Sequence, residues 1–278
     1  MPAFELTIVV LGVAVLAGLV GSLTGLGGGV IVTPALTLLL GVDLRYAIGA
    51  SLVALIATSS GAAATYVRDG LTNIRIGMFL ELATTVGAIC GAMLAGIIPT
   101  STLAIVFGMV LLYSAWQAGS VRRERTKVFS PTPFAHRLRL SGVYHGETGD
   151  TPYAASHPAL GFGIMYGAGI LSGLLGIGSG AFKVIALDRV MGVPFKVSTA
   201  TSNFMIGVTG VASAAIYFGR GYLHPALAFP VMLGVLGGST LGAFLLPRLP
   251  VKQLRRGVAL GVGVVAIQMI VQGFRGHL

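Results

Sequence analysis

The sequence is poor in charge. Only 9% of its 278 residues are Asp, Glu, Lys or Arg, whereas 55% are hydrophobic. A soluble domain carries about 25% charged residues. So few charges cannot cover a water-facing surface of this size, so the composition excludes an ordinary soluble protein and predicts an integral membrane protein in a lipid bilayer.

Residues for redox and metal chemistry are also scarce. The single cysteine, Cys90, excludes an internal disulfide, and the five histidines are scattered in the loop and near segment ends. We therefore expect no metal site and no cofactor. The sequence contains neither HExxH nor GxSxG, and its glycine runs lack the GKS or GKT ending of a phosphate-binding loop, so we expect no enzyme.

The apolar residues are arranged in segments of a length that spans a bilayer. Most are 17–22 residues long, and the second and seventh are shorter. The first has no basic residues before it, which favours a retained helix over a cleaved signal peptide. The ten segments are 5–22, 27–41, 46–66, 76–97, 102–118, 159–175, 179–192, 197–218, 225–246 and 254–273.

The two halves of the chain repeat each other. Adding 151 to a position in the first half gives its counterpart in the second half without a gap, over some 80 positions. The expected division is a first transmembrane repeat (1–118), a basic loop (119–158) and a second transmembrane repeat (159–278). Matched pairs include Gly41/Gly192, Ser51/Ser202, Gly70/Gly221, Gly87/Gly238 and Gly91/Gly242.

The formal net charge of +10 does not indicate nucleic-acid binding, because the basic residues sit mostly between apolar segments, where they set topology. The first and second segments, and likewise the sixth and seventh, are joined at a glycine cluster, and each such couple is called a glycine pair. If all ten segments cross the bilayer, or if the glycine pairs turn back as hairpins, 14 basic residues fall on the side of the long loop and 3 on the other. Treating each glycine pair as one broken span gives 10 against 7. The sharper asymmetry favours the first arrangement, with a cytoplasmic loop, both termini outside and two inverted repeats.

Both repeats carry a glycine cluster inside an apolar stretch: GLGGG at 25–29 and GIGSG at 176–180. Glycine is a poor helix former, so we expect a break and a new helix just after it. In inverted repeats the two breaks can meet near the midplane and aim two helix N-termini at one anion. The alternative is close helix packing. The expected lining residues are Gly27, Gly28, Gly29, Gly178, Ser179 and Gly180.

Lys183 lies one turn past the second break, within an apolar run. Its counterpart in the first repeat is Val32, so the repeat itself does not require a cation there. A charged residue inside a membrane segment is costly and is a candidate site residue, so we expect Lys183 to face the anion. The alternatives are that it reaches the membrane surface or pairs with Asp188.

Hydroxyl and amide side chains offer further donors for an anion. Ser51 lies in the third segment, and Thr201, Ser202 and Asn203 open the eighth. The alternative is hydrogen bonding within or between helices. Asn203 is the strongest candidate on the premise that its own helix satisfies an amide less readily than a hydroxyl.

Glu81 is the one carboxylate well inside a main span. It can carry a coupling proton or pair with a cation. Because it lies five residues from the expected cytoplasmic end of its segment, it can also simply reach the interface.

The stretches GLGGGVIVTPALTLLLGV, GILSGLLGIGSGAFKVIALDRVMGVPFKVSTATSNFMIGVTG and GRGYLHPAL resemble the sulfite exporter TauE/SafE family of bacterial membrane permeases, over nearly the whole chain. The resemblance implies a carrier in the bacterial inner membrane for small sulfur-containing anions, such as sulfite or organosulfonates, often working outward. The implied lining elements are Gly27–Gly29, Gly178–Gly180 and Thr201–Asn203. Ser179 departs from the family pattern, which tends to have glycine there, and adds a hydroxyl at the break.

The residues and the resemblance both lead to an all-α polytopic membrane protein that carries a small anion by alternating access. A passive anion channel and a non-transporting membrane scaffold remain open as alternatives. A homodimer is a further expectation, because many such helical bundles are dimers.

Overall fold

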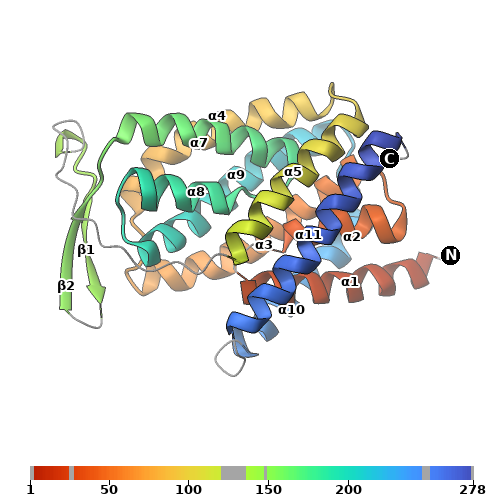
Figure 1. Cartoon of the computed structure of the whole chain (residues 1–278), viewed down its shortest axis with the longest axis horizontal. Coiled ribbons are helices and arrows are strands. Elements are labelled where there is room, and N and C mark those ends of the chain that lie inside the picture. Colours follow the sequence, from red (N-terminus) through yellow and green to blue (C-terminus); the bar gives the residue numbers. More distant parts are fainter. Residues whose placement is uncertain (1–2, 25–27, 120–135, 147–148, 246–250, 277–278) are drawn as a thin grey trace.

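The computed structural model describes residues 3–24, 28–119, 136–146, 149–245 and 251–276, and the statements below concern this part of the chain. It is a bundle of α-helices with one small β-hairpin at one end (Figure 1). Five of its helices are long and apolar enough to cross a membrane. The prediction of an all-α polytopic membrane protein is therefore confirmed.

The ten predicted segments correspond to ten helices, with bounds within a few residues of those expected. The second and seventh segments are the short ones, as predicted, and the seventh continues as a short π-helix, η1. The elements are α1 (Ala3–Thr24), α2 (Gly29–Leu40), α3 (Leu44–Arg68), α4 (Ile74–Ala95), α5 (Thr100–Gly119), α7 (Pro158–Leu175), α8 (Gly180–Ile185), η1 (Ala186–Val190), α9 (Phe195–Gly219), α10 (Pro225–Leu245) and α11 (Val251–Arg275).

The packing of the helices follows the sequence repeat. Helix α1 packs on α10, and their counterparts α7 and α4 pack on each other. Likewise α3 packs on α10, and α9 packs on α4. The two remaining large contacts, α3 with α9 and α5 with α11, each join a helix to its own counterpart. Exchanging the two halves therefore leaves the pattern of these largest contacts unchanged.

Glycines at the closest helix contacts obey the same register. A Cβ atom on Gly18 would collide with the carbonyl oxygen of Val235, and one on Gly169 would collide with that of Thr84. Gly169 is the counterpart of Gly18, and Val235 is the counterpart of Thr84, so the repeat exchanges the two pairs. Small residues at such crossings let two helix backbones approach closely in lipid. Gly87, Gly91 and Gly238 also lie at such crossings, since a Cβ on each would meet a backbone carbonyl of α7 or α1.

In two of the counterpart pairs, the helices run in opposite directions. On α3 and α9, Gly207 lies beside Ser59 and Gly210 beside Ile56, so the position on one helix falls as the position on the other rises. Helices α5 and α11 are antiparallel by the same criterion, because Gly108 lies beside Ala266 and Gly273 beside Ile105.

Helix ends also repeat. Gly41 and its counterpart Gly192 both have positive φ, at 64° and 71°, and so do Gly70 and Gly221, at 68° and 76°. Glycine adopts this left-handed conformation without strain, and it is the usual way to end a helix. These matched glycines therefore fix the same turns in both halves.

The hairpin, β1 (Ser141–Gly146) paired antiparallel with β2 (Gly149–Ala154), lies in the loop and was not predicted from the sequence. It lies at the end of the bundle opposite both termini (Figure 1). Asn73, in the turn between α3 and α4, donates to the hydroxyl of Tyr153 at 2.9 Å. Burial raises the pKa of the Tyr153 phenol, and the bond to Asn73 opposes this in part. The hairpin is thus joined to the bundle by a partly buried hydrogen bond.

The opposite end of the bundle holds two arginines from different halves. Arg45 donates to the carbonyl of Ala95 at 3.2 Å, and Arg220 donates to those of Ala92 and Met93 at 3.2 and 2.8 Å. Cations at these positions stabilise the negative C-terminal end of α4. Both arginines therefore lie at one end, as the charge pattern predicted.

Candidate functional site

The two glycine clusters come together in the fold. A new helix begins just after each one, α2 at Gly29 and α8 at Gly180, as predicted. A Cβ on Gly29 would lie 3.1 Å from the carbonyl oxygen of Gly176, at the end of α7. Gly27 lies outside the described residues. The first helical turn after one break is thus in contact with the start of the other break.

One apolar side chain from each half packs on the breaks. A Cβ on Gly29 would lie 3.0 Å from Leu55, and one on Gly180 would lie 2.9 Å from Ile206. Leu55 and Ile206 are counterparts in the repeat. A Cβ on Gly178 would meet both of them, at 3.3 and 3.0 Å. The breaks therefore share one packed junction, in which a side chain at these glycine positions would press on Leu55 and Ile206.

The two breaks differ in backbone conformation. At the second, Gly176, Gly178 and Ser179 all have positive φ, at 65°, 68° and 43°. At the first, Gly28 is right-handed, with φ of −61°. Ser179 is therefore strained, because left-handed geometry disfavours residues with a Cβ.

Ser179 also has an unusual side chain. It is 3% exposed, and its hydroxyl has no hydrogen-bond partner within the described chain. It lines a cavity of about 10 Å³, next to Ser114 and Phe182. That volume holds about one water molecule. The second break thus keeps an unpaired hydroxyl beside a small space.

Lys183 is fully buried, at 0% exposure. Its ammonium donates to the hydroxyl of Thr209 on α9 at 2.7 Å, and that hydroxyl lies 2.7 Å from a carboxylate oxygen of Glu81 on α4. Thr209 is 0% exposed and Glu81 4%. A cation from the second repeat and an anion from the first are thus joined through one hydroxyl, and the alternative in which Lys183 reaches the surface is wrong.

The carboxylate of Glu81 is surrounded by hydroxyls. Thr84 donates to one oxygen at 2.8 Å and Thr85 to the other at 3.1 Å, in addition to Thr209. Burying a carboxylate is costly unless it is hydrogen-bonded and its charge is compensated. Here hydroxyls donate to both oxygens, and the cation of Lys183 lies on the other side of the Thr209 hydroxyl. The alternative that Glu81 reaches the membrane interface is wrong, because the side chain is buried.

The other predicted residues lie around this network with mixed partners. Ser51 reaches the second break, where its hydroxyl lies 2.9 Å from the carbonyl of Gly176. Ser202 faces Gly180, with a hydroxyl-to-carbonyl distance of 3.4 Å. Thr201 instead accepts from the backbone N–H of Asn73 at 3.0 Å, near the hairpin.

The structure contradicts the premise that a helix satisfies the amide of Asn203 less readily than a hydroxyl. Its amide donates to the carbonyl of Thr199, one turn earlier on α9, at 3.2 Å. An asparagine amide is therefore satisfied by its own helix here, and the argument that singled out Asn203 was wrong. Its backbone carbonyl accepts from the hydroxyl of Ser59 on α3.

Sequence reasoning missed three residues of the network: Thr84, Thr85 and Thr209. The first two were detectable, since they follow Glu81 by three and four residues and so lie on the same helix face. Thr209 matches Thr58 in the repeat, but only the folded structure shows that Thr209 meets both charges.

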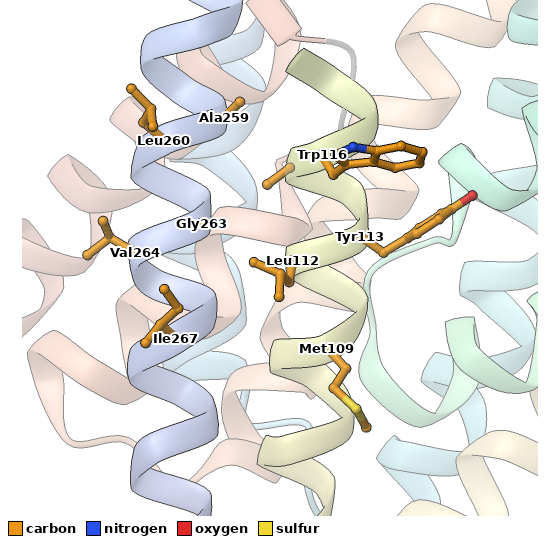
Figure 2. Close-up of a pocket in the computed structure, with 10 residues that line it drawn as sticks. Met109, Leu112, Tyr113, Trp116, Ala259, Leu260, Gly263, Val264 and Ile267 are labelled. Atoms are coloured by element: carbon orange, nitrogen blue, oxygen red, sulfur yellow. The ribbon is translucent and has the colours of Figure 1, made fainter. Parts of the chain in front are cut away.

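A separate apolar groove lies between α5 and α11, with a volume of about 1010 Å³. Figure 2 shows Leu112, Val264 and Ile267 along it, with Trp116 near one end. Trp116 is 69% exposed. The lining of the groove is apolar apart from the Tyr113 hydroxyl and the Trp116 indole N–H, so the groove suits lipid or another apolar surface rather than an anion.

Comparison with known proteins agrees with the architecture. The chain is 27% identical over 274 residues to the "Probable membrane transporter protein YunE" of Bacillus subtilis, covering 96% of this chain and 97% of that one. It is 25% identical to YdhB, a second such protein of B. subtilis, over 92% and 96% of the two chains. A relative of the same description from Haemophilus influenzae is 26% identical, over 97% of this chain and 100% of its own.

No solved structure matches the chain. The family model described as "Sulfite exporter TauE/SafE" matches residues 10–269. The described part of the chain has five helices long and apolar enough to cross a membrane, and its relatives are described as membrane transporters, so the chain belongs to the sulfite exporter TauE/SafE family of multi-pass membrane transporters.

Proposed function

We propose that the protein is a carrier for small sulfur-containing anions, such as sulfite or organosulfonates, and that it exports them. The observation that supports this most strongly is Lys183, a fully buried cation on the short helix that begins at the second glycine break. The family description supports the sulfur chemistry of the substrate.

The donors around the break suit a small anion. The ammonium of Lys183 carries three N–H groups, and within the described chain its one hydrogen bond goes to Thr209. Two donors are thus available to a ligand. The unpaired hydroxyl of Ser179, on the turn before Lys183, offers a third. A single buried cation balances one negative charge, so a monoanion fits best.

We further propose that the two halves are inverted repeats that rock against each other in an alternating-access cycle. The antiparallel course of counterpart helices and the exchange symmetry of the helix contacts support this. The junction of the two breaks is packed by Leu55 and Ile206, so access from either side requires these two side chains to move apart.

The proposed location is the bacterial inner membrane, with the hairpin end in the cytoplasm. The basic residues support this orientation, because cytoplasmic ends of membrane proteins are enriched in Lys and Arg. A homodimer remains a proposal, for which the groove between α5 and α11 is one available surface.

Counterflow in proteoliposomes tests the function. Vesicles loaded with unlabelled sulfite or 2-hydroxyethanesulfonate should take up the same labelled anion transiently above equilibrium, with saturation, whereas acetate and nitrate should not compete. A passive channel would pass the label without counterflow. A scaffold would give the same trace as empty vesicles, and either result contradicts the proposal.

A further inference from the structure

Two of the three hydroxyls around Glu81, those of Thr209 and Thr84, have a second acceptor within reach. The Thr209 hydroxyl oxygen lies 2.7 Å from a Glu81 carboxylate oxygen and 2.8 Å from the carbonyl of Met205. The Thr84 hydroxyl oxygen lies 2.8 Å from the other carboxylate oxygen and 3.1 Å from the main-chain carbonyl of Glu81. Each hydroxyl has one proton, so it donates to one acceptor at a time.

This arrangement satisfies Glu81 in both protonation states. When the carboxylate is ionised, the hydroxyls donate to it. When it is protonated, Thr209 or Thr84 can turn its own proton to the main-chain carbonyl and accept from the acid. A backbone N–H group could not do this, because it can only donate. The surroundings of Glu81 are thus suited to a carboxyl group that changes its charge.

Lys183 is the charged group that faces Glu81 within the described chain. Helix α7, packed on α4, has no charged residue, and its Tyr166 hydroxyl lies against Cys90. On α4 itself, Arg75 reaches the carbonyl of Arg139 beside the hairpin. On α9, the charge is Lys196 in the first turn, which lies over the Tyr144 ring. The η1 segment after α8 carries Asp188 and Arg189.

The charge balance of this pair links the proton to the substrate. With Lys183 and Glu81 both ionised, the buried network is neutral. An anion bound at Lys183 adds a negative charge that the network cannot balance, and an uncompensated buried charge is strongly unfavourable. A proton on Glu81 restores neutrality, with Lys183 then paired to the anion alone.

We propose that Glu81 takes up one proton whenever an anion binds at Lys183, so that the two cross the membrane together. Export by this cycle is driven by the outward gradient of the anion and runs against an inward proton gradient, which by itself drives uptake. This inference rests on the proposed role of Lys183. The proton comes from water on the side to which the site is open, adds to a carboxylate oxygen of Glu81, and leaves to water on the other side with the anion. No other bond forms or breaks.

The test separates exchange from proton-driven uptake. Proteoliposomes receive labelled sulfite or, in parallel, labelled 2-hydroxyethanesulfonate, whose charge is constant near neutral pH. With the outside more acidic by one unit, the wild type should accumulate the sulfonate up to about tenfold, since one proton accompanies each anion and their gradients balance. Glu81→Gln should lose this accumulation while still exchanging anion at a reduced rate.

Thr58→Val is the matched control. Thr58 is the repeat counterpart of Thr209, and its hydroxyl bonds back to the carbonyl of Ala54 on its own helix. This variant should accumulate anion like the wild type. If Glu81→Gln accumulates anion as the wild type does, or if the wild type exchanges anion but ignores the pH gradient, the inference is wrong. If the wild type exchanges neither anion, the proposed function itself fails.

A second measurement needs no variant and covers the case in which Glu81→Gln does not fold. Adding 2-hydroxyethanesulfonate or sulfite to purified wild-type protein in weakly buffered detergent should take up about one proton per anion bound, after correction for the anion's own titration. Anion binding without proton uptake would overturn the inference.

Discussion

The two halves of this transporter are alike in packing and unlike in charge. Counterpart glycines support counterpart helix crossings, and counterpart turns end in left-handed glycines. Yet Lys183 matches Val32, and Glu81 matches Met232. Each half thus contributes one charge that the other half lacks, and the two charges meet across the repeat. The features that the two halves share position the helices, whereas the candidate site contains residues in which the halves differ.

Lys183→Met should have the largest effect. It keeps the length and apolar stem of the side chain but removes the cation, so we expect anion counterflow to fall by at least about 100-fold, which is about 3 kcal/mol of lost interaction with the anion. Counterflow of labelled sulfite in proteoliposomes measures it.

The double variant Lys183→Met/Glu81→Gln separates structure from function. Removing one partner leaves an uncompensated buried charge, and removing both does not. The double variant should regain most of the stability that Lys183→Met loses. Its anion transport should stay as low as that of Lys183→Met. Transport by the double variant at the wild-type rate would rule out an anion-binding role for Lys183.

Packing symmetry predicts that Gly18→Ala and Gly169→Ala act alike. In both, the new methyl group would collide with a counterpart backbone carbonyl, on Val235 or Thr84. Overpacking of this kind costs about 1–3 kcal/mol. Unfolding in SDS should show a similar loss for the two variants, and Gly12→Ala, where a Cβ meets open space, serves as control. Unequal losses would mean that the two crossings are not equivalent.

Thr209→Val and Thr58→Val compare counterpart hydroxyls. The first removes the link between Lys183 and Glu81, and a hydrogen bond to a charged group contributes about 1.5–3 kcal/mol. We expect about a tenfold slower counterflow for Thr209→Val and less than about a twofold change for Thr58→Val. Equal effects would show that the network adds nothing to transport.

Ser179→Gly should give the smallest change. Glycine relieves the left-handed strain at φ of 43°, so stability should rise by up to about 1 kcal/mol, measured as a higher thermal midpoint in detergent. Ser179→Ala keeps the strain and removes only the hydroxyl. A change in the relative counterflow of sulfite and sulfonates in both variants would indicate that this hydroxyl contacts the substrate.

The sequence was sufficient to predict the ten helices, because long apolar segments in a chain with little charge have few other solutions. It also predicted that new helices begin after the two glycine clusters. The hairpin at 141–154 was missed, because a two-stranded ribbon leaves little periodic signal in a polar loop.

Side-chain partners were harder to predict than helices. Glu81 and Lys183 stood out individually, since charges are rare in membrane segments. Their connection through Thr209 depends on how α4, α8 and α9 cross, which no local pattern specifies. Asn203 is the opposite case: its amide has a local bond to Thr199, against the premise that its own helix satisfies an amide less readily, while its role toward the substrate stays a prediction.

The most direct test of the account is anion-dependent stability of the purified protein. A ligand that binds only the folded state raises its thermal midpoint. Sulfite or a sulfonate should raise the thermal midpoint of the wild type by much more than acetate or nitrate does. Neither should raise the thermal midpoint of Lys183→Met/Glu81→Gln. If the sulfur anions shift both proteins equally, the buried lysine does not bind the substrate and the central claim is contradicted.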